Sequence, residues 1–245
     1  MNKLNNLISI VVPVYNESDS IRLLINEIIN VMKSHQLLFE LIIVNDGSVD
    51  RTSNVLENLS LEIKQLTVIN LRKNYGQTAA LAAGFDHSNG DIIVTLDGDL
   101  QNDPNDIPKL ITNINEGYDL ICGWRFQRKD KLLNRRIPSQ IANRLIGNVT
   151  GIHLHDYGCS LKAFKHEIIK DIKLYGELHR FLPVLANIEG AKIKEIKVNH
   201  RSRKYGQSKY GIDRTFRVLM DLLTVWFMNK FLTRPMYVFG FIGII

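Results

Sequence analysis

The sequence predicts an α/β domain in which a mostly parallel sheet carries helices on both of its faces. In the first part of the chain, short apolar runs rich in valine and isoleucine alternate with segments of helix length. Strands joined through helices pair in parallel, and strands covered on both faces are apolar throughout. The chain has 245 residues, 45% hydrophobic and 23% charged, which is enough for one such domain with a sizeable core.

The expected elements can be placed by their periodicity and length. Strands are expected over 7–14, 39–44, 66–71 and 91–96, with helices over about 18–33, from about 50, and over 76–87. Beyond residue 101 the pattern predicts helices over 105–116 and 138–150, strands over 118–123 and 195–199, and a basic segment at 125–136.

The C-terminal part of the chain has a different pattern. Over 209–230, apolar residues recur at helical spacing with basic residues opposite, which predicts amphipathic helices at a membrane surface. The uncharged tail 236–245 covers about half of the roughly 20 residues that cross a bilayer, so we expect it to begin an incomplete transmembrane segment. The expected divisions are a main domain (1–205), basic juxtamembrane helices (206–234) and this tail (235–245).

Charge and cysteine content narrow the classes of protein. The net charge of +6 suits nucleic acid, an anionic membrane or a phosphorylated substrate. Cys122 and Cys159 are too few for a disulfide framework or a metal cluster, so we interpret them as core residues in a reducing compartment. The start of the chain reads directly into a strand rather than a signal peptide, which predicts a cytoplasmic location. Neither a dinucleotide-binding glycine motif nor a phosphate-binding P-loop motif occurs.

Two carboxylates and an amide follow the strand expected at 91–96. They belong to Asp97, Asp99 and Gln101. Ligands of open α/β sheets bind beyond the carboxyl ends of the strands, and oxygen ligands gathered there suit a hard cation such as Mg²⁺ or Mn²⁺. The alternative is a solvated turn, because a bare Asp-x-Asp occurs in many turns.

Several segments together resemble the family 2 glycosyltransferases, in particular their polyprenyl-phosphate branch, which includes dolichyl-phosphate mannosyltransferases and undecaprenyl-phosphate glucosyltransferases. Four segments match the family generally: VPVYNE (12–17), VNDGS (44–48), RKNYGQ (72–77) and DGDLQ (97–101). Three match the polyprenyl-phosphate branch: DYGCSLK (156–162), ELHRFLP (177–183) and RKYGQSKY (203–210). The resemblance covers nearly the whole chain in order, and it implies a catalytic domain with the GT-A fold.

The resemblance implies a nucleotide-sugar site at the ends of the first strands. The residues that it assigns to the nucleotide are Pro13, Tyr15, Asn16, Glu17, Asp46, Asn74, Gly76 and Gln77. Asp46 can accept hydrogen bonds from a base N–H or a ribose hydroxyl; its alternative role is a helix cap or turn. Asp99 and Gln101 are assigned to the metal, and Asp97 to the ribose or a metal-bound water.

The acceptor phosphate is assigned to Arg125, Arg135 and Ser139. Arg135 and Ser139 are spaced to share one helix face, and a guanidinium with a hydroxyl suits a phosphate monoester. A solvated basic face is the alternative. Asp156 resembles a residue near the sugar and is counted with Asp97 and Asp99 as catalytic, although a structural role is also open. A general base is unnecessary if the nucleophile is a phosphate oxygen, whose second pKa is about 6.

A basic loop precedes the amphipathic helix. Its members are Arg201, Arg203, Ser208 and Lys209, which we interpret as a lid over the diphosphate that also faces the membrane. Attraction to anionic lipid, on the order of 1 kcal/mol per basic residue, is the alternative.

The prediction is therefore an inverting, metal-dependent hexosyltransferase at the cytoplasmic face of a membrane. UDP-glucose is the expected donor, GDP-mannose the alternative donor, and a polyprenyl phosphate the expected acceptor. A soluble saccharide acceptor, a nucleotidyltransferase and an inactive nucleotide-sugar sensor are the rival interpretations. No nucleic-acid partner is expected, and the sequence leaves a homo-oligomer open.

Overall fold

A computed structural model describes residues 6–126, 137–203, 213–231 and 234–244. Its centre is a seven-stranded sheet of order β3-β2-β1-β4-β6-β5-β7. The strands are β1 (Ile8–Val14), β2 (Phe39–Asn45), β3 (Leu66–Asn70), β4 (Ile92–Thr95), β5 (Leu120–Arg125), β6 (Lys162–Lys165) and β7 (Ile193–Val198). Every pairing is parallel except those of β6, which runs antiparallel to both β4 and β5. The predicted mostly parallel sheet is confirmed.

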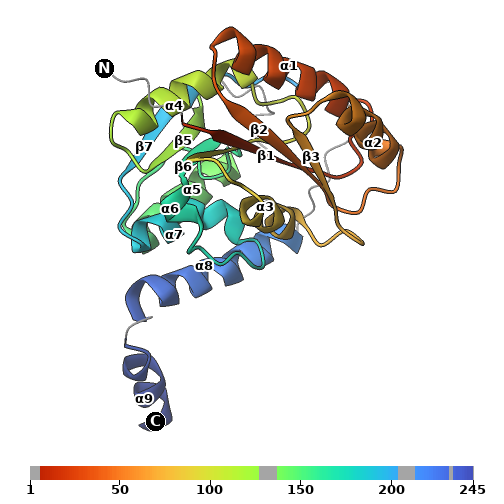
Figure 1. Ribbon diagram of the computed structural model, residues 1–245. Helices are drawn as coiled ribbons and strands as arrows, with labels where there is room; N and C mark the ends of the chain where they lie inside the picture. The colour runs from red at the N-terminus through yellow and green to blue at the C-terminus, as the bar shows by residue number, and fades with distance from the viewer. Residues whose placement is uncertain (1–5, 127–136, 204–212, 232–233, 245) are drawn as a thin grey trace.

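Helices cover both faces of the sheet, as Figure 1 shows. The helices of the described residues are α1 (Ile21–Ser34), α2 (Thr52–Glu62), α3 (Gln77–Asp86), α4 (Ile107–Asn115), α5 (Ile137–Thr150), α6 (His166–Ile169), α7 (Leu182–Ile188), α8 (Asp213–Phe231) and α9 (Met236–Ile244), with short 3-10 helices η1 (Pro104–Asp106) and η3 (Leu178–Phe181). Helices α1, α2 and α4 lie on one face, and α3, α6 and α7 on the other.

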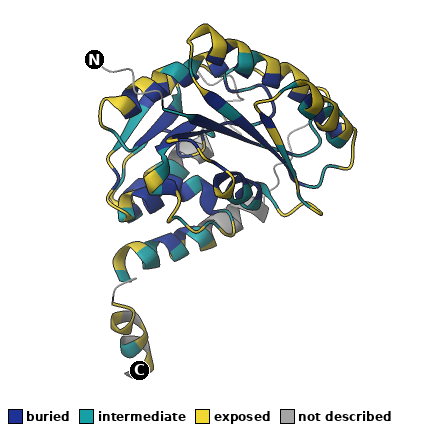
Figure 2. Cartoon of the chain, in the orientation of Figure 1, coloured by how far each residue is buried: buried dark blue, intermediate teal, exposed yellow. Residues whose placement is uncertain are grey.

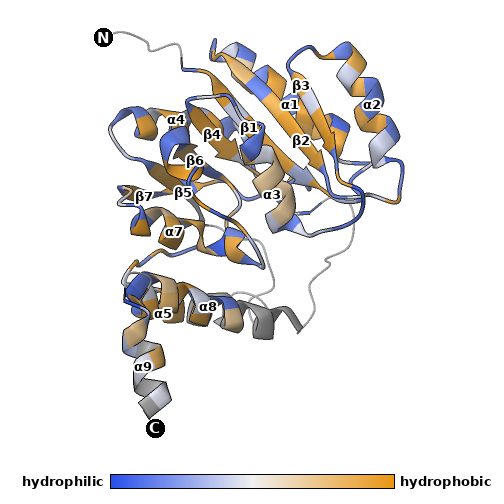
Figure 3. Ribbon diagram, turned by 60° about the horizontal axis from the view of Figure 1, so that its bottom comes forward, coloured by the Kyte–Doolittle hydropathy of each residue, from blue (hydrophilic) through white to orange (hydrophobic). Residues whose placement is uncertain are grey.

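Strand β1 shows why its sequence is almost wholly apolar. Ile10 and Val12 are buried in the core beneath α1, whereas Val11, between them, is buried in the core beneath α3. Successive side chains of a strand point to opposite faces, so burial on both faces favours apolar residues along the whole strand. Ser9, the polar residue of β1, is buried with its hydroxyl donating to Glu40 Oε1. Figures 2 and 3 show the same result for the sheet as a whole, whose strands are largely buried and hydrophobic.

Helix α8 packs on the domain through part of its apolar surface. Leu222 and Val225 are buried in a third cluster, with residues of α5, η3 and α7, whereas Met220 and Leu223 are 42% and 53% exposed. Helix α9 projects away from the domain in Figure 1, and its described side chains Met236, Tyr237 and Phe239 are exposed. Among the described helices, none has both the length and the hydropathy needed to cross a bilayer.

The topology brings the carboxyl ends of β1, β2, β3 and β4 to one edge of the sheet. These strands are adjacent and parallel, so the loops that follow them meet there. Antiparallel β6 starts at the same edge, beside the end of β4, because Lys162 pairs with Thr95. The segment 156–161, which precedes β6, therefore lies at the same edge of the sheet as the loops that follow β1 and β4.

The close approach of α3 to the sheet gives a first prediction. A Cβ at Gly84 would lie 2.3 Å from Cγ1 of Val11, which is fully buried and stiff at χ1. We expect Gly84→Ala to lower the free energy of unfolding by about 1–3 kcal/mol, despite the roughly 1 kcal/mol that alanine gains in a helix. Urea denaturation measures this change. The loss should be smaller when Gly84→Ala is introduced into a Val11→Ala background, and an equal loss in both backgrounds would show that the contact is not its cause.

Candidate active site

Asp97 and Asp99 occupy the turn after β4, and each carboxylate has a partner from another loop. Gln77, the first residue of α3, donates from Nε2 to Asp97 Oδ1 at 2.7 Å. Arg203 donates from Nη2 to Asp99 Oδ2 at 2.6 Å, and the backbone N–H of Gln101 donates to Asp99 Oδ1 at 3.1 Å. Leu100, between Asp99 and Gln101, adopts a φ of 62°. Three distant loops are thus joined at one edge of the sheet.

The environment of Asp99 disfavours the ionised form of its carboxylate. Asp99 is only 8% exposed, and burial, with the nearby negative charge of Asp97 and Glu17, raises its pKa to about 6, despite the opposing effect of Arg203. A carboxylate whose charge is destabilised by burial and by like charges is stabilised by a nearby cation. This electrostatic environment fits a divalent metal ion.

The guanidinium of Arg203 contacts both predicted metal ligands, Asp99 and Gln101. Arg203 Nη2, 2.6 Å from Asp99 Oδ2, also lies 3.3 Å from Gln101 Oε1. In the described part of the chain no group of three or more His, Cys, Asp or Glu side chains could hold a metal. A metal here would therefore be held by a carboxylate, an amide oxygen and oxygens of the substrate, which is a donor set typical of Mg²⁺ and Mn²⁺.

Asp46 is engaged by the loop that precedes α3. Its two carboxylate oxygens accept the backbone N–H groups of Tyr75, at 2.7 Å, and Gly76, at 2.9 Å. Gly76 adopts a φ of 94°, a conformation that favours glycine. Burial is the main cause of a raised pKa at Asp46, and these two hydrogen bonds oppose it. Asp46 therefore fixes the loop that carries Asn74, and its predicted contact with the nucleotide stays a prediction.

Four of the eight residues assigned to the nucleotide line one of two hollows. Tyr15 and Asn74 line an open groove of about 520 Å³ at the ends of β2 and β3. Pro13 and Gln77 line a smaller cavity of about 50 Å³ beside Asp97. Asn16, at a φ of 55°, connects the first two loops: its N–H donates to Ser48 Oγ, and its side-chain oxygen accepts the N–H of Val49. The N–H of Glu17 donates to Thr52 Oγ1 at 2.9 Å.

Arg125 and Asp156 form a largely buried ion pair. Arg125 Nε and Nη2 donate to the two oxygens of Asp156 at 2.6 and 2.8 Å, and the side chains are 14% and 6% exposed. Burial lowers the pKa of Arg125, but the hydrogen bond and charge of Asp156 outweigh it and raise that pKa above its ordinary value. The structure therefore brings together a residue assigned to the acceptor phosphate and one assigned to the sugar.

Glu195, which the sequence analysis did not single out, holds the segment that contains Asp156. Its carboxylate accepts the backbone N–H of His155 at 3.0 Å and that of Asp156 at 2.9 Å. Glu195 lies on β7, far away in the sequence, and no local motif marks it.

The predicted lid and acceptor residues are only partly described. Arg201 pairs with Glu27 at 2.6 Å and with Asp103 at 2.7 Å, and its backbone N–H donates to the carbonyl of Gln101. The loop that leads to α8 is thereby attached to the Asp99 turn. Arg135, Ser208 and Lys209 lie outside the described residues, and Ser139 is described in α5 by its backbone alone.

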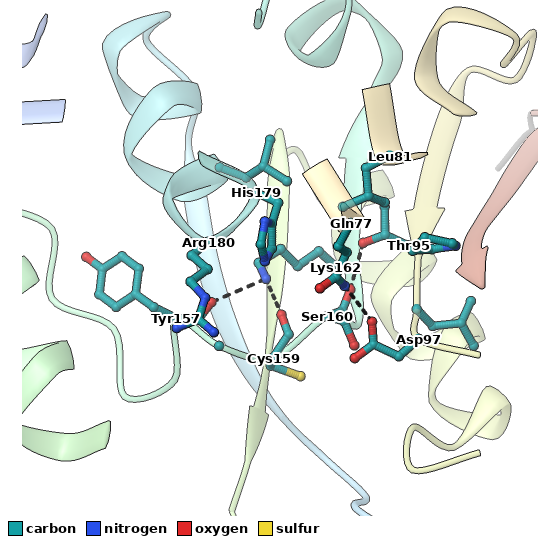
Figure 4. A pocket seen from close by; sticks show the side chains of 14 residues that line it. Gln77, Leu81, Thr95, Asp97, Tyr157, Cys159, Ser160, Lys162, His179 and Arg180 are labelled. Carbon is teal, nitrogen blue, oxygen red and sulfur yellow. Dashed lines mark hydrogen bonds between the residues drawn. The ribbon is translucent and has the colours of Figure 1, made fainter. Parts of the chain in front are cut away.

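Side chains that no sequence pattern brings together line the small cavity opposite Asp97. Figure 4 shows Lys162, His179 and Arg180 on that side. His179 Nδ1 lies 2.7 Å from Thr78 Oγ1, which connects η3 to the first turn of α3. The motifs that contain these residues were recognised, but contacts between positions 101 residues apart leave no periodic signal.

The Arg125–Asp156 pair gives a second prediction. Asp156→Ala leaves a buried guanidinium without its counter-charge, so we expect a loss of about 3–5 kcal/mol in the free energy of unfolding. Thermal denaturation should show a fall in Tm of roughly 6–20 °C. Arg22→Ala is the control, because Arg22 and Glu62 form an exposed pair, 48% and 63% accessible, of the kind worth at most about 1 kcal/mol. A stable Asp156→Ala protein that has lost activity would instead assign Asp156 to chemistry.

Comparison with known proteins identifies the family of the chain. Residues 9–173 match the family described as Glycosyl transferase family 2. The dodecaprenyl-phosphate galacturonate synthase of Rhizobium johnstonii is 47% identical over 241 residues, which cover 97% of this chain and 71% of that protein. An undecaprenyl-phosphate 4-deoxy-4-formamido-L-arabinose transferase of Shewanella sediminis is 38% identical, over 97% of this chain and 70% of that protein.

A solved structure extends the comparison to the fold. Glucosyl-3-phosphoglycerate synthase from Mycobacterium tuberculosis, in complex with Mn²⁺, uridine diphosphate and phosphoglyceric acid, superimposes with a TM-score of 0.66 at 18% identity, covering 91% of this chain and 78% of that one. At this identity the likeness concerns the fold alone, and it confirms the predicted GT-A type. The chain therefore belongs to glycosyltransferase family 2 and, within it, to the polyprenyl-phosphate glycosyltransferases.

Proposed function

We propose that this enzyme transfers a hexose from a nucleotide sugar to a polyprenyl phosphate, with inversion at the anomeric carbon. The observation that carries the proposal is the position of the Asp97–Asp99 turn. The turn lies at the same edge of the sheet as the groove lined by Tyr15 and Asn74, and Asp97 itself lines the small cavity. A nucleoside in the groove would thus have its diphosphate near Asp99 and its sugar near Asp97.

The donor nucleotide is proposed to be UDP, with UDP-glucose as the sugar donor that the sequence analysis expects. The relatives are named for other sugars, galacturonate and 4-deoxy-4-formamido-L-arabinose. The sugar is therefore the variable part of the reaction within this set of proteins, and a panel of donors is needed to fix it.

Asp99 and Gln101 would hold the metal, and Gln77 would keep Asp97 oriented toward the sugar through their 2.7 Å hydrogen bond. A bound Mg²⁺ or Mn²⁺ supplies positive charge to the diphosphate, which becomes more negative as it leaves. Arg203 lies at the same oxygens and is proposed to turn to the diphosphate when the metal binds. Once the donor is bound, positive charges held in place near the diphosphate would stabilise the charge that develops on it.

The acceptor phosphate is proposed to bind near Arg125, with Arg135 and Ser139 completing the site. A phosphate oxygen attacks the anomeric carbon as the bond from that carbon to the diphosphate oxygen breaks. Because the second pKa of a phosphate monoester is about 6, the nucleophile is ionised at neutral pH and no protein base is required. Asp156, held in its pair with Arg125, then has the role of fixing the guanidinium rather than accepting a proton.

The acceptor is a lipid, so the site has to work at a membrane surface. Met220 and Leu223 on α8, together with the exposed side chains of α9, are the apolar residues proposed to enter the interface. An exposed apolar face next to basic residues is typical of helices that lie in the headgroup region. We propose the cytoplasmic face.

The experiment that tests the function is a transfer assay with radiolabelled sugars. The protein, Mn²⁺ and undecaprenyl phosphate in detergent are offered labelled UDP- and GDP-sugars, and label in the organic phase is counted. We expect lipid-linked label that depends on metal and is abolished by Asp99→Ala. Asp86→Ala, which removes an exposed carboxylate at the end of α3, is the control and should retain transfer.

Two outcomes would contradict parts of this proposal. Nearly normal turnover by Asp99→Ala would remove the metal assignment. Release of nucleoside diphosphate without label in lipid would keep the donor assignment and overturn the lipid acceptor, in favour of a saccharide acceptor.

The position of Arg203 gives a further prediction. Since its guanidinium contacts both proposed metal ligands, metal and Arg203 compete for the same oxygens. We expect Arg203→Ala to bind Mn²⁺ several-fold more tightly than the wild type in the absence of donor, measured by isothermal titration. Arg201→Ala is the matched control, because Arg201 pairs with Glu27 and Asp103 and not with Asp99. Equal Mn²⁺ affinity in the wild type and Arg203→Ala would show that the two cations do not compete.

A further inference from the structure

The small cavity beside Asp97 contains a buried lysine. Lys162, at the start of β6, is only 4% exposed and lines this cavity together with Asp97 and Gln77. Its Nζ donates to the carbonyl oxygens of Tyr157, at 3.5 Å, and of Cys159. Figure 4 shows this ammonium on the side of His179 and Arg180, across the cavity from Asp97.

The charge of Lys162 has no negative partner in the described part of the chain. Both of its hydrogen-bond acceptors are neutral carbonyls. The nearby thiols of Cys122 and Cys159 stay protonated at neutral pH, because burial raises their pKa values to about 12 and about 11. Of the nearby carboxylates, Asp156 is paired with Arg125, and Glu195 accepts the backbone N–H groups of His155 and Asp156. Asp97 lies across the cavity and accepts a hydrogen bond from Gln77. A buried ammonium without a counter-charge is unfavourable, so an anion arriving in this cavity would be stabilised.

The cavity has room for one substituent of a sugar. An ammonium has three N–H donors, and two of those of Lys162 are directed to carbonyls, which leaves the third for a ligand. A volume of about 50 Å³ holds a group of a few atoms rather than a whole pyranose ring. The ring itself would lie outside, on the side of Asp97, with one substituent directed inward toward Lys162.

We propose that this cavity binds the carboxylate of a uronic acid, so that the donor is a nucleotide-linked hexuronic acid in place of the UDP-glucose expected from the sequence, and that Lys162 determines this specificity. This proposal rests on the proposed function and specifies its donor sugar. A hexuronic acid differs from its hexose only at C6, where a carboxylate replaces a hydroxymethyl group. Lys162 would donate to that carboxylate, and Arg180, which lines the same cavity, adds positive charge nearby. The His179–Thr78 contact fixes this side of the cavity against α3.

The test compares donors in matched pairs that differ only at C6. The wild-type enzyme is offered UDP-glucuronic acid against UDP-glucose, and UDP-galacturonic acid against UDP-galactose, with undecaprenyl phosphate as acceptor. We expect at least one uronic acid to exceed its neutral partner in kcat/KM by roughly 10- to 100-fold, the range for one hydrogen bond to a charged group. Preference for the neutral member in both pairs would overturn this proposal while leaving the proposed function intact. Absence of lipid-linked label with every donor would overturn both.

Variants locate the preference in Lys162. Lys162→Met should reduce the ratio of uronate to hexose turnover toward one, and Lys162→Arg should retain most of it. Lys165→Met, on the same strand, removes a lysine paired with Asp119 and should leave the ratio unchanged. A purely structural role for Lys162 would lower both donors equally, and that result would overturn the assignment.

A binding measurement on the wild type keeps the test independent of whether the variants fold. Isothermal titration of UDP-glucuronic acid and UDP-glucose, with Mn²⁺ and without acceptor, should show tighter binding of the uronate. Equal affinities in titration, together with equal kcat/KM values, would contradict the proposal.

Discussion

Compensation of buried negative charge at the end of β4 is the constraint on which the site depends. Asp99 is nearly inaccessible to water and lies near Asp97 and Glu17, so its ionised form requires nearby positive charge or hydrogen-bond donors. The structure meets this requirement with groups from other segments: Gln77 at Asp97, and the N–H of Gln101 and the guanidinium of Arg203 at Asp99. Each of these contacts attaches the segment that carries the partner to the Asp97–Asp99 turn. The same charge that suits a metal ion therefore also assembles the surrounding loops.

Much of the fold could be predicted because its causes are local. Strand β1 is almost wholly apolar because both its faces are covered, and the Asp97–Asp99 turn stands out because carboxylates follow a buried run directly. The family assignment, confirmed by the match over residues 9–173, followed from short motifs in order. Among the site residues, the structure brings together Asp97 with Gln77, Asp99 with Gln101, and Arg125 with Asp156. Their roles in binding stay predictions.

What the sequence did not reveal depends on contacts between distant segments. Strand β6 has only four residues, begins and ends with lysine, and is recognisable as a strand only through its pairing with β4 and β5. Lys162 reads as a surface residue until that pairing buries it. Likewise, the contact of Glu195 with the backbone of Asp156 spans 39 residues, and no periodicity in either segment marks it. The partnership of Arg203 with both proposed metal ligands is non-local in the same way.

The antiparallel strand β6 lies at the boundary between two contiguous parts of the chain. On one side, β3, β2, β1 and β4 come from residues 8–95; on the other, β5 and β7 come from residues 120–198. The groove lined by Tyr15 and Asn74 is built wholly from the earlier part, whereas the side chains facing Asp97 across the small cavity come from the later part. If the donor binds as proposed, substitutions in the later part would alter which sugar is accommodated and would leave the groove for the nucleotide unchanged. Because the two parts are separate along the chain, related proteins could change the sugar that they transfer through substitutions in the later part and still bind the nucleotide in the same way.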